Sequence, residues 1–372
     1  MFKNIYTYVY TFGHLKRLLL YNILYIMPGK KRSGLANDRR AYSYYTFNKN
    51  NFNIFCPSIT ISDIATFNTP SWTLNNNSTI LLCQTLIIPL GATLIIPSDL
   101  TMTVNGTITN NGTITNNGTV TINNTGILNN TGIINNIFYP VSYVGIINNA
   151  GTINNDHIFN NSYTLSRLNN SGKFYNNTSG ILNNTSGAQF INNNGGELIN
   201  NGSITTGGDL VTSEIINNSG GQIYNNKSIR IVDYNIITNY GTITNNNNGY
   251  EFRIDNLAIL NNNSGGIIIN TNSGAIINIG TVNNAIGGII NNTSSATITN
   301  SPEFEGISNF INNGIIYNNN SATLTNNNIV NNSGTINSPA SSGGCGVGII
   351  NGANPITNTG GNINTANDAC PP

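Results

Sequence analysis

Across residues 104–124, one aliphatic side chain recurs between polar neighbours every six residues. The segment reads VNGTITNNGTITNNGTVTINN, and its unit, Gly-x-aliphatic-x-Asn-Asn, continues with drift as far as Gly334. In Thr107-Ile108-Thr109, alternation places the Ile on one face and both Thr on the other, which predicts a strand of about three residues. We expect Asn-Asn-Gly to turn the chain, because Asn and Gly accept positive φ. Gly, Asn and β-branched residues at this density oppose helix formation.

Strands this short are not stable alone. Coiling the chain lets each strand pair in parallel with the equivalent strand one turn later. Stacked Ile would fill the interior, and stacked Asn about 4.8 Å apart would form hydrogen-bonded ladders along the axis. Three six-residue units give a triangular coil of roughly 18 residues, and longer units extend it to about 24. Because the spacing is irregular, the sequence predicts an all-β fold, a right-handed parallel β-helix (β-solenoid), rather than the strictly six-residue left-handed form.

The start of the repeat carries a family resemblance. Residues 85–124 read TLIIPLGATLIIPSDLTMTVNGTITNNGTITNNGTVTINN, with Ile-Pro pairs at 88–89 and 96–97 around Gly91. This segment resembles the Asn- and Thr-rich right-handed β-helices of large surface adhesins and of Asn-rich repeat proteins of giant viruses. The resemblance covers about 85–338 and implies a surface or structural role. It is specific for architecture and weak for function, since one fold serves many functions.

Four cysteines lie in the segments that flank the repeat. Cys56 and Cys83 fall at either end of a predicted N-terminal cap (56–84), which also carries the only Trp. Cys345 and Cys370 fall in a Gly- and Ser-rich C-terminal tail or cap (339–372), expected to be flexible. A disulfide within each flank would close a loop of about 26 residues and stabilise it by about 3 kcal/mol. The alternative is four buried thiols in a reducing compartment.

The chain is poor in charge and rich in two residue types. Only 7% of its 372 residues are charged, against about 25% in typical soluble proteins, while 79 are Asn and 57 are Ile. This composition excludes most enzyme classes and is too aliphatic for a disordered polar tract. No run approaches the roughly 18 consecutive apolar residues of a membrane span.

Positive charge is concentrated in the predicted N-terminal arm (1–55), which holds nine Lys or Arg and one acid. The segment 1–26 contains Lys16 and Arg17 before LLLYNILYIM, which is either signal-like or a dispensable extension ahead of a start at Met27. A basic patch follows, with nearby tyrosines. It predicts contact with nucleic acid, an acidic surface or an anionic membrane, or else a solvated terminus; its residues are Lys30, Lys31, Arg32, Arg39 and Arg40.

One charged cluster inside the repeat is a candidate for catalysis. Glu251, Arg253 and Asp255 alternate in EFRID and should point the same way, joined by Arg230 and Asp233 from one coil earlier. Polysaccharide lyases and hydrolases built on β-helices need carboxylates, or a carboxylate with a basic group, on one solvent face. Alternating charge on an exposed strand is more often a solvated, self-compensating face. The sequence shows no metal-ligand spacing and no phosphate-binding loop, so we expect no cofactor.

Pairs of Thr in the first coils suggest a third candidate function, ice binding, because they resemble the flat Thr arrays of β-solenoid antifreeze proteins. The motifs TMT, TIT, TIT and TVT begin at Thr101, Thr107, Thr113 and Thr119. Six-residue spacing should distribute these pairs around the faces of the coil, whereas an ice plane needs the same face in every coil. The spacing therefore argues against ice binding.

Asn-x-Ser/Thr acceptor sequences for glycosylation are abundant. Composition alone would produce many of them, so each carries little weight. They include Asn105, Asn111, Asn117, Asn123, Asn129, Asn160, Asn169, Asn176 and Asn183.

Taken together, these patterns predict a structural or adhesive surface protein, a rigid rod that presents Thr/Asn faces, with or without glycans, to a partner. We expect it on a virion or a cell surface. Partners compatible with the sequence are a second copy, as a trimer or an end-to-end stack, and a surface glycan or protein. The competing class is a carbohydrate-acting β-helix enzyme.

Overall fold

The computed structural model describes residues 57–137, 144–208, 211–246, 249–302, 308–338, 349–351, 356–358 and 361–364. The chain divides into two units, Met1–Cys56 and Pro57–Pro372, and every described residue lies in the second. The predicted basic arm, with Lys30, Lys31, Arg32, Arg39 and Arg40, therefore falls outside the described residues, as do Cys56, Cys345 and Cys370.

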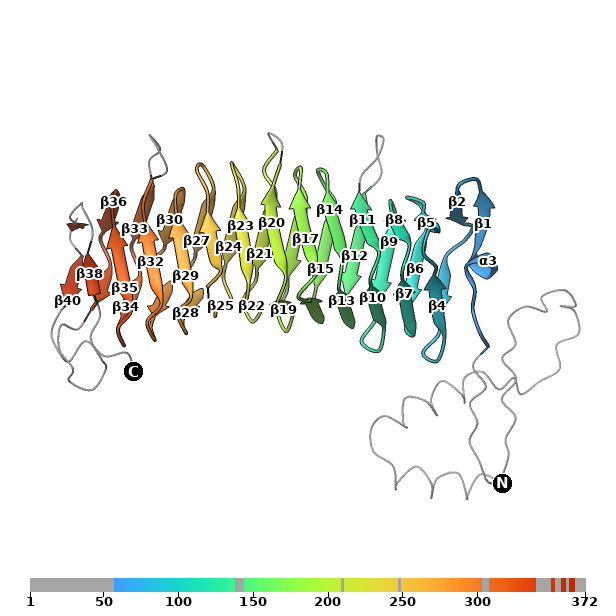
Figure 1. Ribbon diagram of the computed structural model, residues 1–372, viewed down its shortest axis with the longest axis horizontal. Coiled ribbons are helices and arrows are strands. Elements are labelled where there is room, and N and C mark those ends of the chain that lie inside the picture. Colours follow the sequence, from blue (N-terminus) through green and yellow to red (C-terminus); the bar gives the residue numbers. More distant parts are fainter. Residues whose placement is uncertain are drawn as a thin grey trace, which may run out of the picture. The chain divides into compact units, whose positions relative to one another are not determined.

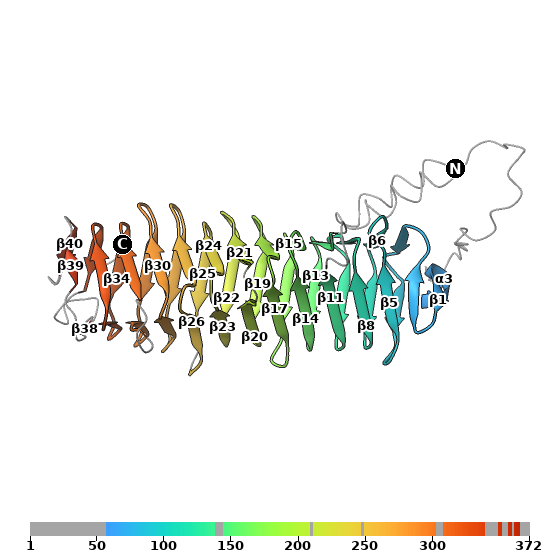
Figure 2. The same ribbon diagram turned by 90° about the horizontal axis from the view of Figure 1, so that it is seen from above.

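The described part of Pro57–Pro372 is a parallel β-solenoid with three faces, which confirms the predicted fold class. Its strands form one 14-stranded and two 13-stranded sheets, and from β2 onward strands pair with the strand three places later in the chain. Strands of successive coils lie side by side in both views (Figures 1 and 2). The handedness of the coil stays a prediction.

Sheet 1 is the 14-stranded face. Its strands, in order along the axis, are β1 (Ala65–Asn68), β2 (Ser71–Leu74), β5 (Thr93–Ile96), β8 (Thr113–Asn116), β11 (Ile133–Ile137), β14 (Ile158–Ser162), β17 (Ile181–Thr185), β20 (Ser203–Gly207), β23 (Ser228–Ile231), β26 (Glu251–Ile254), β29 (Ala275–Asn278), β32 (Thr297–Asn300), β35 (Thr323–Asn326) and β38 (Ile349–Asn351).

Sheets 2 and 3 are the two 13-stranded faces. Sheet 2 consists of β4 (Thr85–Ile88), β7 (Thr107–Asn110), β10 (Ile127–Asn130), β13 (Thr152–Asn155), β16 (Lys173–Asn176), β19 (Glu197–Asn200), β22 (Gln222–Asn225), β25 (Thr242–Asn245), β28 (Ile267–Asn270), β31 (Ile289–Asn292), β34 (Ile315–Asn318), β37 (Thr335–Asn337) and β40 (Asn362–Asn364). Sheet 3 consists of β3 (Ser78–Ile80), β6 (Thr101–Val104), β9 (Thr119–Ile122), β12 (Ile146–Asn149), β15 (Arg167–Asn170), β18 (Gln189–Asn192), β21 (Glu214–Asn217), β24 (Ile236–Asn239), β27 (Ile259–Asn262), β30 (Thr281–Asn284), β33 (Asn309–Asn312), β36 (Ile329–Asn332) and β39 (Thr357–Asn358).

The N-terminal end begins with a short cap. The helix α3 (Ile61–Ile64) starts at a capping box, in which Asp63 accepts hydrogen bonds from the backbone N–H and the hydroxyl of Thr60. These bonds lower the pKa of Asp63 below its ordinary value. Strand β1 then pairs antiparallel with β2, the first strand of the parallel part of sheet 1. In this way β1 covers the edge that β2 would otherwise expose. The rings of Phe67 and Trp72 lie 5.1 Å apart across this pair.

The sheets extend beyond both ends of the repeat defined from sequence (85–338). On the N-terminal side, β2 and β3 already pair in parallel with β5 and β6, so the 56–84 segment contributes strands to the first coil. On the C-terminal side, β38, β39 and β40 pair in parallel with β35, β36 and β37. The described residues of the segment 339–372 therefore contribute three strands to the solenoid.

Each four-residue strand of the repeat buries its second and fourth side chains. In β7 the side chains of Ile108 and Asn110 point inward, and those of Thr107 and Thr109 point outward. Our expectation that the strand ends at Thr109 was wrong: the alternation continues for one more residue, and Asn110 is fully buried. Only the second Asn of the repeat, with Gly, forms the turn.

The buried Asn side chains form hydrogen-bonded ladders, as predicted from stacking, but inside the coil. In sheet 2 each Nδ2 donates to the Oδ1 of the next coil at 2.7 or 2.8 Å from Asn110 as far as Asn318. The second Nδ2 proton reaches a backbone carbonyl of the following face; Asn130, for example, donates to the carbonyl of Ile158 at 3.0 Å. Because both protons are used, the amide can be buried without a large desolvation cost.

Each ladder has a defined first member. Asn110 and Asn149 begin the ladders of sheets 2 and 3, and their Oδ1 atoms have no hydrogen-bond partner in the described residues. The strand-paired residues one coil earlier are Ile88 and Ile122, which offer no donor. In sheet 1, the ladder that starts at Asn116 stops at Thr206, followed by Ile231 and Ile254, and resumes at Asn278.

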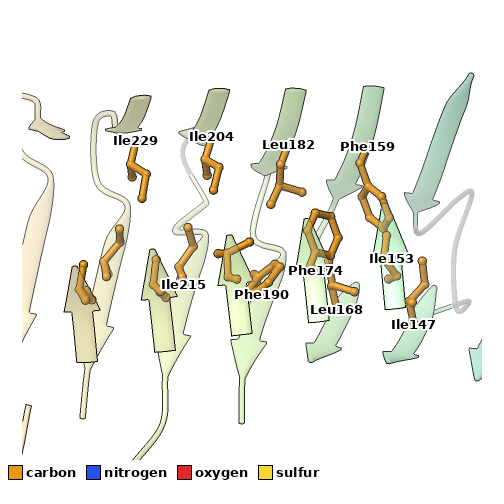
Figure 3. Close-up of a cluster of buried hydrophobic side chains, with 14 of the residues drawn as sticks. Ile147, Ile153, Phe159, Leu168, Phe174, Leu182, Phe190, Ile204, Ile215 and Ile229 are labelled. Carbon is orange, nitrogen blue, oxygen red and sulfur yellow. The ribbon is translucent and has the colours of Figure 1, made fainter. Parts of the chain in front are cut away.

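Aliphatic and aromatic side chains fill the rest of the interior. Phe159, Phe174 and Phe190 come from sheets 1, 2 and 3 and are fully buried. Their rings meet edge to face, with centroids 5.3 and 5.8 Å apart along the series (Figure 3). The cluster thus ties together strands from all three faces over slightly more than one coil of the solenoid.

The corner glycines that directly precede a strand of the repeat leave no room for a side chain. A Cβ at Gly172 would lie 2.2 Å from the carbonyl oxygen of Gly151, the equivalent residue one coil earlier. We predict that Gly172→Ala destabilises the fold by about 3 kcal/mol, because the corner backbone has to move. In Gly91→Ala the new Cβ meets nothing within 4 Å, so we expect only about 1 kcal/mol from the positive φ. Chemical denaturation measures both; equal losses would contradict the tight corner.

Candidate functional site

The outer faces present mainly hydroxyl, amide and aliphatic groups. In the first coils, Thr101 and Thr119 are strand partners on sheet 3, as are Thr107 and Thr85 on sheet 2. The Thr pairs thus lie on different faces, as the six-residue spacing predicted. In the next coil Ile127 replaces Thr107 on the same face. Each row of paired Thr is therefore short, which leaves no extended flat Thr array for ice.

Outward Asn side chains also pair between coils, in the opposite direction to the buried ones. Asn154 donates from its Nδ2 to the Oδ1 of Asn129 in the preceding coil at 2.8 Å, and Asn160 does the same to Asn135. These pairs hold parts of the outer surface in fixed register. They do not form one continuous Thr/Asn wall, because half-buried Ile residues take outward positions on the same faces. Among them are Ile267, Ile289 and Ile315, which follow Thr242 in the first outward column of sheet 2.

The glycosylation acceptor sequences separate into two groups. Asn176 is fully buried in the sheet 2 ladder, where it donates to Asn200 and accepts from Asn155. A folded chain cannot offer it to a modifying enzyme. The other eight acceptors predicted from sequence are half-exposed: Asn105, Asn111, Asn117, Asn123, Asn129, Asn160, Asn169 and Asn183.

The charged residues predicted as a candidate site form a network of ion pairs with one another. The Nε atoms of Arg230 and Arg253 each lie 2.5 Å from a different oxygen of Asp255. The two arginines are strand partners in adjacent coils, so one carboxylate bridges two stacked guanidinium groups. Glu251 adds a longer pair, 3.7 Å from Nη1 of Arg253. Asp233 lies in a turn with φ of 52° and takes part in none of the ion pairs among the described residues.

This arrangement matches a structural ion-pair network better than a catalytic pair. Both oxygens of Asp255 are occupied by cations, and its side chain is only 13% exposed, so the carboxylate is held in place rather than offered to a substrate. The cluster also lines neither of the two surface hollows described below. The geometry thus supports the self-compensating alternative for Glu251, Arg253 and Asp255.

We predict that Asp255→Asn destabilises the fold by about 2 kcal/mol, because it removes two charge-assisted bonds and leaves two stacked arginines facing each other. Glu251→Gln is the matched control. Glu251 is half-exposed and its contact is long, so we expect a loss below about 0.5 kcal/mol. Chemical denaturation at low and high salt measures both, and salt should reduce the first loss. Equal, small losses for both variants would show that the network contributes little.

A second ion pair lies on sheet 2, where Lys173 and Glu197 are strand partners 3.4 Å apart. The hydrogen bond and charge of Glu197 raise the pKa of Lys173. A raised lysine pKa means that the pair contributes fully below the ordinary lysine pKa and is lost as the pH rises through the higher folded value. Lys173 is exposed and Glu197 is half-exposed, so the pair adds little to stability.

The described residues form, among others, two hollows on the outer surface. The larger, about 650 Å³, is called here the Tyr240 hollow and is lined by Asn193, Asn194, Asn218, Ser219, Tyr240, Ser264 and Gly265. The smaller, about 310 Å³, is called the Ala150 hollow; Asn148, Ala150, Asn169 and Ser171 are among its lining residues. Sequence reasoning missed both, because neither contains a charged or metal-binding motif. In the sequence, only the different lengths of the turns at this corner indicate where they lie.

The described residues contain no group of three or more His, Cys, Asp or Glu side chains that could hold a metal ion. Among them there is also no helix with the length and hydropathy of a membrane span. Cys83 is disulfide-bonded. The predicted pairings Cys56–Cys83 and Cys345–Cys370 stay predictions, because the other three cysteines lie outside the described residues.

Comparisons with known proteins add one structural similarity. No protein-family model matches the chain, and no curated protein matches it. Among solved structures, the chain is similar to a TibA fragment that was hyper-glycosylated by TibC. The two share 17% sequence identity with a TM-score of 0.30, over 81% of this chain and 97% of that chain.

Proposed function

We propose that this chain is a structural or adhesive surface protein, a rigid solenoid that presents hydroxyl and amide faces to a partner on a cell or virion surface. The observation that carries the proposal is the set of interior Asn ladders. From Asn110 to Asn318 on sheet 2, every coil is tied to the next by a buried side-chain hydrogen bond as well as by its backbone. Such coupling favours a stiff support on which outer side chains keep a fixed spacing.

The outer faces support a presenting role rather than a reacting one. Their paired Asn residues, such as Asn129 and Asn154, are preordered hydrogen-bonding groups, so little side-chain entropy is lost when a partner binds. The half-exposed acceptor asparagines would carry glycans if the chain meets a glycosylating enzyme. Self-association as a trimer or end-to-end stack, and binding of an anionic partner by Lys30 to Arg40, stay part of the proposal.

The test is a retention assay with the full chain. Beads coated with the folded protein are washed over a mucin-coated surface and over the same surface after enzymatic removal of its glycans. We expect the folded chain to retain beads and the heat-unfolded chain to lose them. Retention that is equal for folded and unfolded protein would overturn the adhesive proposal. Sedimentation of the same sample measures whether the chain is a monomer or an oligomer.

A further inference from the structure

Turn length varies along the corner where sheet 3 passes into sheet 2. The turns β18–β19, β21–β22 and β27–β28 each have four residues, at 193–196, 218–221 and 263–266. The turn β24–β25 has only two, Tyr240 and Gly241. A short turn therefore lies between long ones, and the two missing residues leave a gap.

This gap is the Tyr240 hollow. Strands of successive coils lie about 4.8 Å apart, so the long turns on either side of Tyr240 stand about 9.6 Å from each other. Tyr240 forms the floor with its side chain 42% exposed, and its backbone N–H is fixed by a 2.7 Å bond to the carbonyl of Asn217. Ser219 and Ser264 belong to the two walls and are exposed.

The missing turn also leaves backbone groups without their usual partners. Where long turns are adjacent, the third residue of one turn donates its N–H to the next coil: Gly195 donates to the carbonyl of Gly220 at 3.2 Å, and Gly265 to that of Gly287 at 3.0 Å. Gly220 has the same positive φ as Gly195, 78°, but the next coil carries the short turn. Its N–H has no acceptor among the described residues.

The lining carries no charged side chain. It offers two serine hydroxyls, the amides of Asn193, Asn194 and Asn218, and one phenol ring. Phosphate, sulfate and carboxylate ligands prefer cationic groups, which are missing from this lining. A purely apolar ligand would leave the hydroxyl and amide groups of the lining without hydrogen bonds. Alternating hydroxyl and C–H surfaces, as on a sugar ring, match donors and acceptors on the walls and an aromatic face on the floor.

We propose that the Tyr240 hollow binds a single ring of a neutral saccharide, with the ring's C–H face against Tyr240 and its hydroxyls bonded to Ser219, Ser264 and the Asn218 amide. This assignment rests on the proposed function, since it names one surface through which the chain would adhere. The Ala150 hollow lies on the same corner but has Ala150 where the larger one has Tyr240. It serves as the internal comparison.

The test uses two variants of the full chain. Tyr240→Ala removes the aromatic floor. Replacing Tyr240 and Gly241 with Asn-Ser-Gly-Gly, the turn found at 218–221, rebuilds a long turn and closes the hollow. Tyr234→Ala is the control, because Tyr234 is also exposed, 52%, but lies in the turn between β23 and β24. None of the three changes a buried side chain, so thermal unfolding should stay close to that of the wild type.

Binding is measured by ligand-observed NMR and titration with maltohexaose, cellohexaose and chitohexaose, and with the anionic polygalacturonate. We expect the wild type to bind at least one neutral oligosaccharide in the millimolar range. Tyr240→Ala and the closed-turn variant should bind it at least tenfold more weakly, and Tyr234→Ala should bind it with the same affinity as the wild type. No binding of any neutral oligosaccharide, or equal binding by wild type and the closed-turn variant, would overturn the proposal.

The bead assay separates this proposal from the adhesive one. If the closed-turn variant loses the oligosaccharide but still retains beads on mucin, the hollow is a sugar site and adhesion uses other faces. If the wild type binds no neutral oligosaccharide yet retains beads, the saccharide site is wrong and the adhesive function stands. If the wild type binds the sugar but retains no beads, the saccharide site is confirmed and the adhesive function is wrong.

Discussion

Replacing Asn200 with alanine should lower the free energy of unfolding by about 4 kcal/mol. Asn200 is fully buried in the middle of the sheet 2 ladder. It accepts from Asn176 at 2.8 Å and donates to Asn225 and to the carbonyl of Ser228, each at 2.8 Å. The substitution leaves these groups unpaired in the interior, and each such loss costs about 1–3 kcal/mol. Chemical denaturation of the full chain measures the change.

Two further variants isolate the cause. Asn200→Leu fills nearly the same space but offers no hydrogen bond, so it should be as damaging as Asn200→Ala if the ladder, rather than packing, is responsible. Asn201→Ala changes the neighbouring outward residue, which accepts one exposed bond from Asn226, and should cost less than about 1 kcal/mol. A mild Asn200→Leu would mean that the interior asparagines stabilise mainly by filling volume.

Replacing Phe174 with alanine should cost about 3–5 kcal/mol, because it empties the centre of the three-ring cluster. Phe174 has no exposed surface and meets Phe159 and Phe190 edge to face. Its strand partners in the adjacent coils are Ile153 and Leu198. The loss should therefore come from a cavity that these smaller side chains cannot close. Denaturation midpoints, with a binding test for small apolar molecules such as benzene, measure it.

Phe174→Leu is the matched control. Leu is already tolerated one coil later at residue 198, so the column accepts its shape, and we expect a loss of about 1–1.5 kcal/mol. Losses of the same size for Phe174→Ala and Phe174→Leu would show that the interior collapses around a smaller residue. The aromatic cluster would then contribute no more to stability than aliphatic side chains at the same positions.

The repeat made the architecture predictable. Alternation in Thr107-Ile108-Thr109 identified the inward Ile, and six-residue spacing predicted three faces. Both follow from the geometry of a strand and need no knowledge of distant contacts. The same alternation should have placed Asn110 inside. We expected it in the turn because Asn favours turns in isolation, whereas here the ladder satisfies its amide and tertiary structure overrides that preference.

The surface was less predictable than the core. Alternation in EFRID correctly brought Glu251 and Arg253 to one side, but it does not show that Asp255 bridges two arginines, since that depends on which coil pairs with which. The Tyr240 hollow depends on the difference between a two-residue and a four-residue turn. In the sequence this is only the contrast between NYGT at 239–242 and NNSGGQ at 217–222, and it acquires meaning once the coils are aligned.

The central claim is that one Asn of most repeats lies inside the solenoid in a hydrogen-bonded ladder. Hydrogen exchange of Asn side-chain amides, followed by NMR on protein labelled in asparagine, tests it most directly. Two populations are expected: slowly exchanging amides from ladder positions such as Asn155, Asn200 and Asn245, and fast ones from turn positions such as Asn111. Assignment uses the Asn200→Leu variant, which should remove one slow signal. A single population that exchanges as fast as exposed amides would contradict the account.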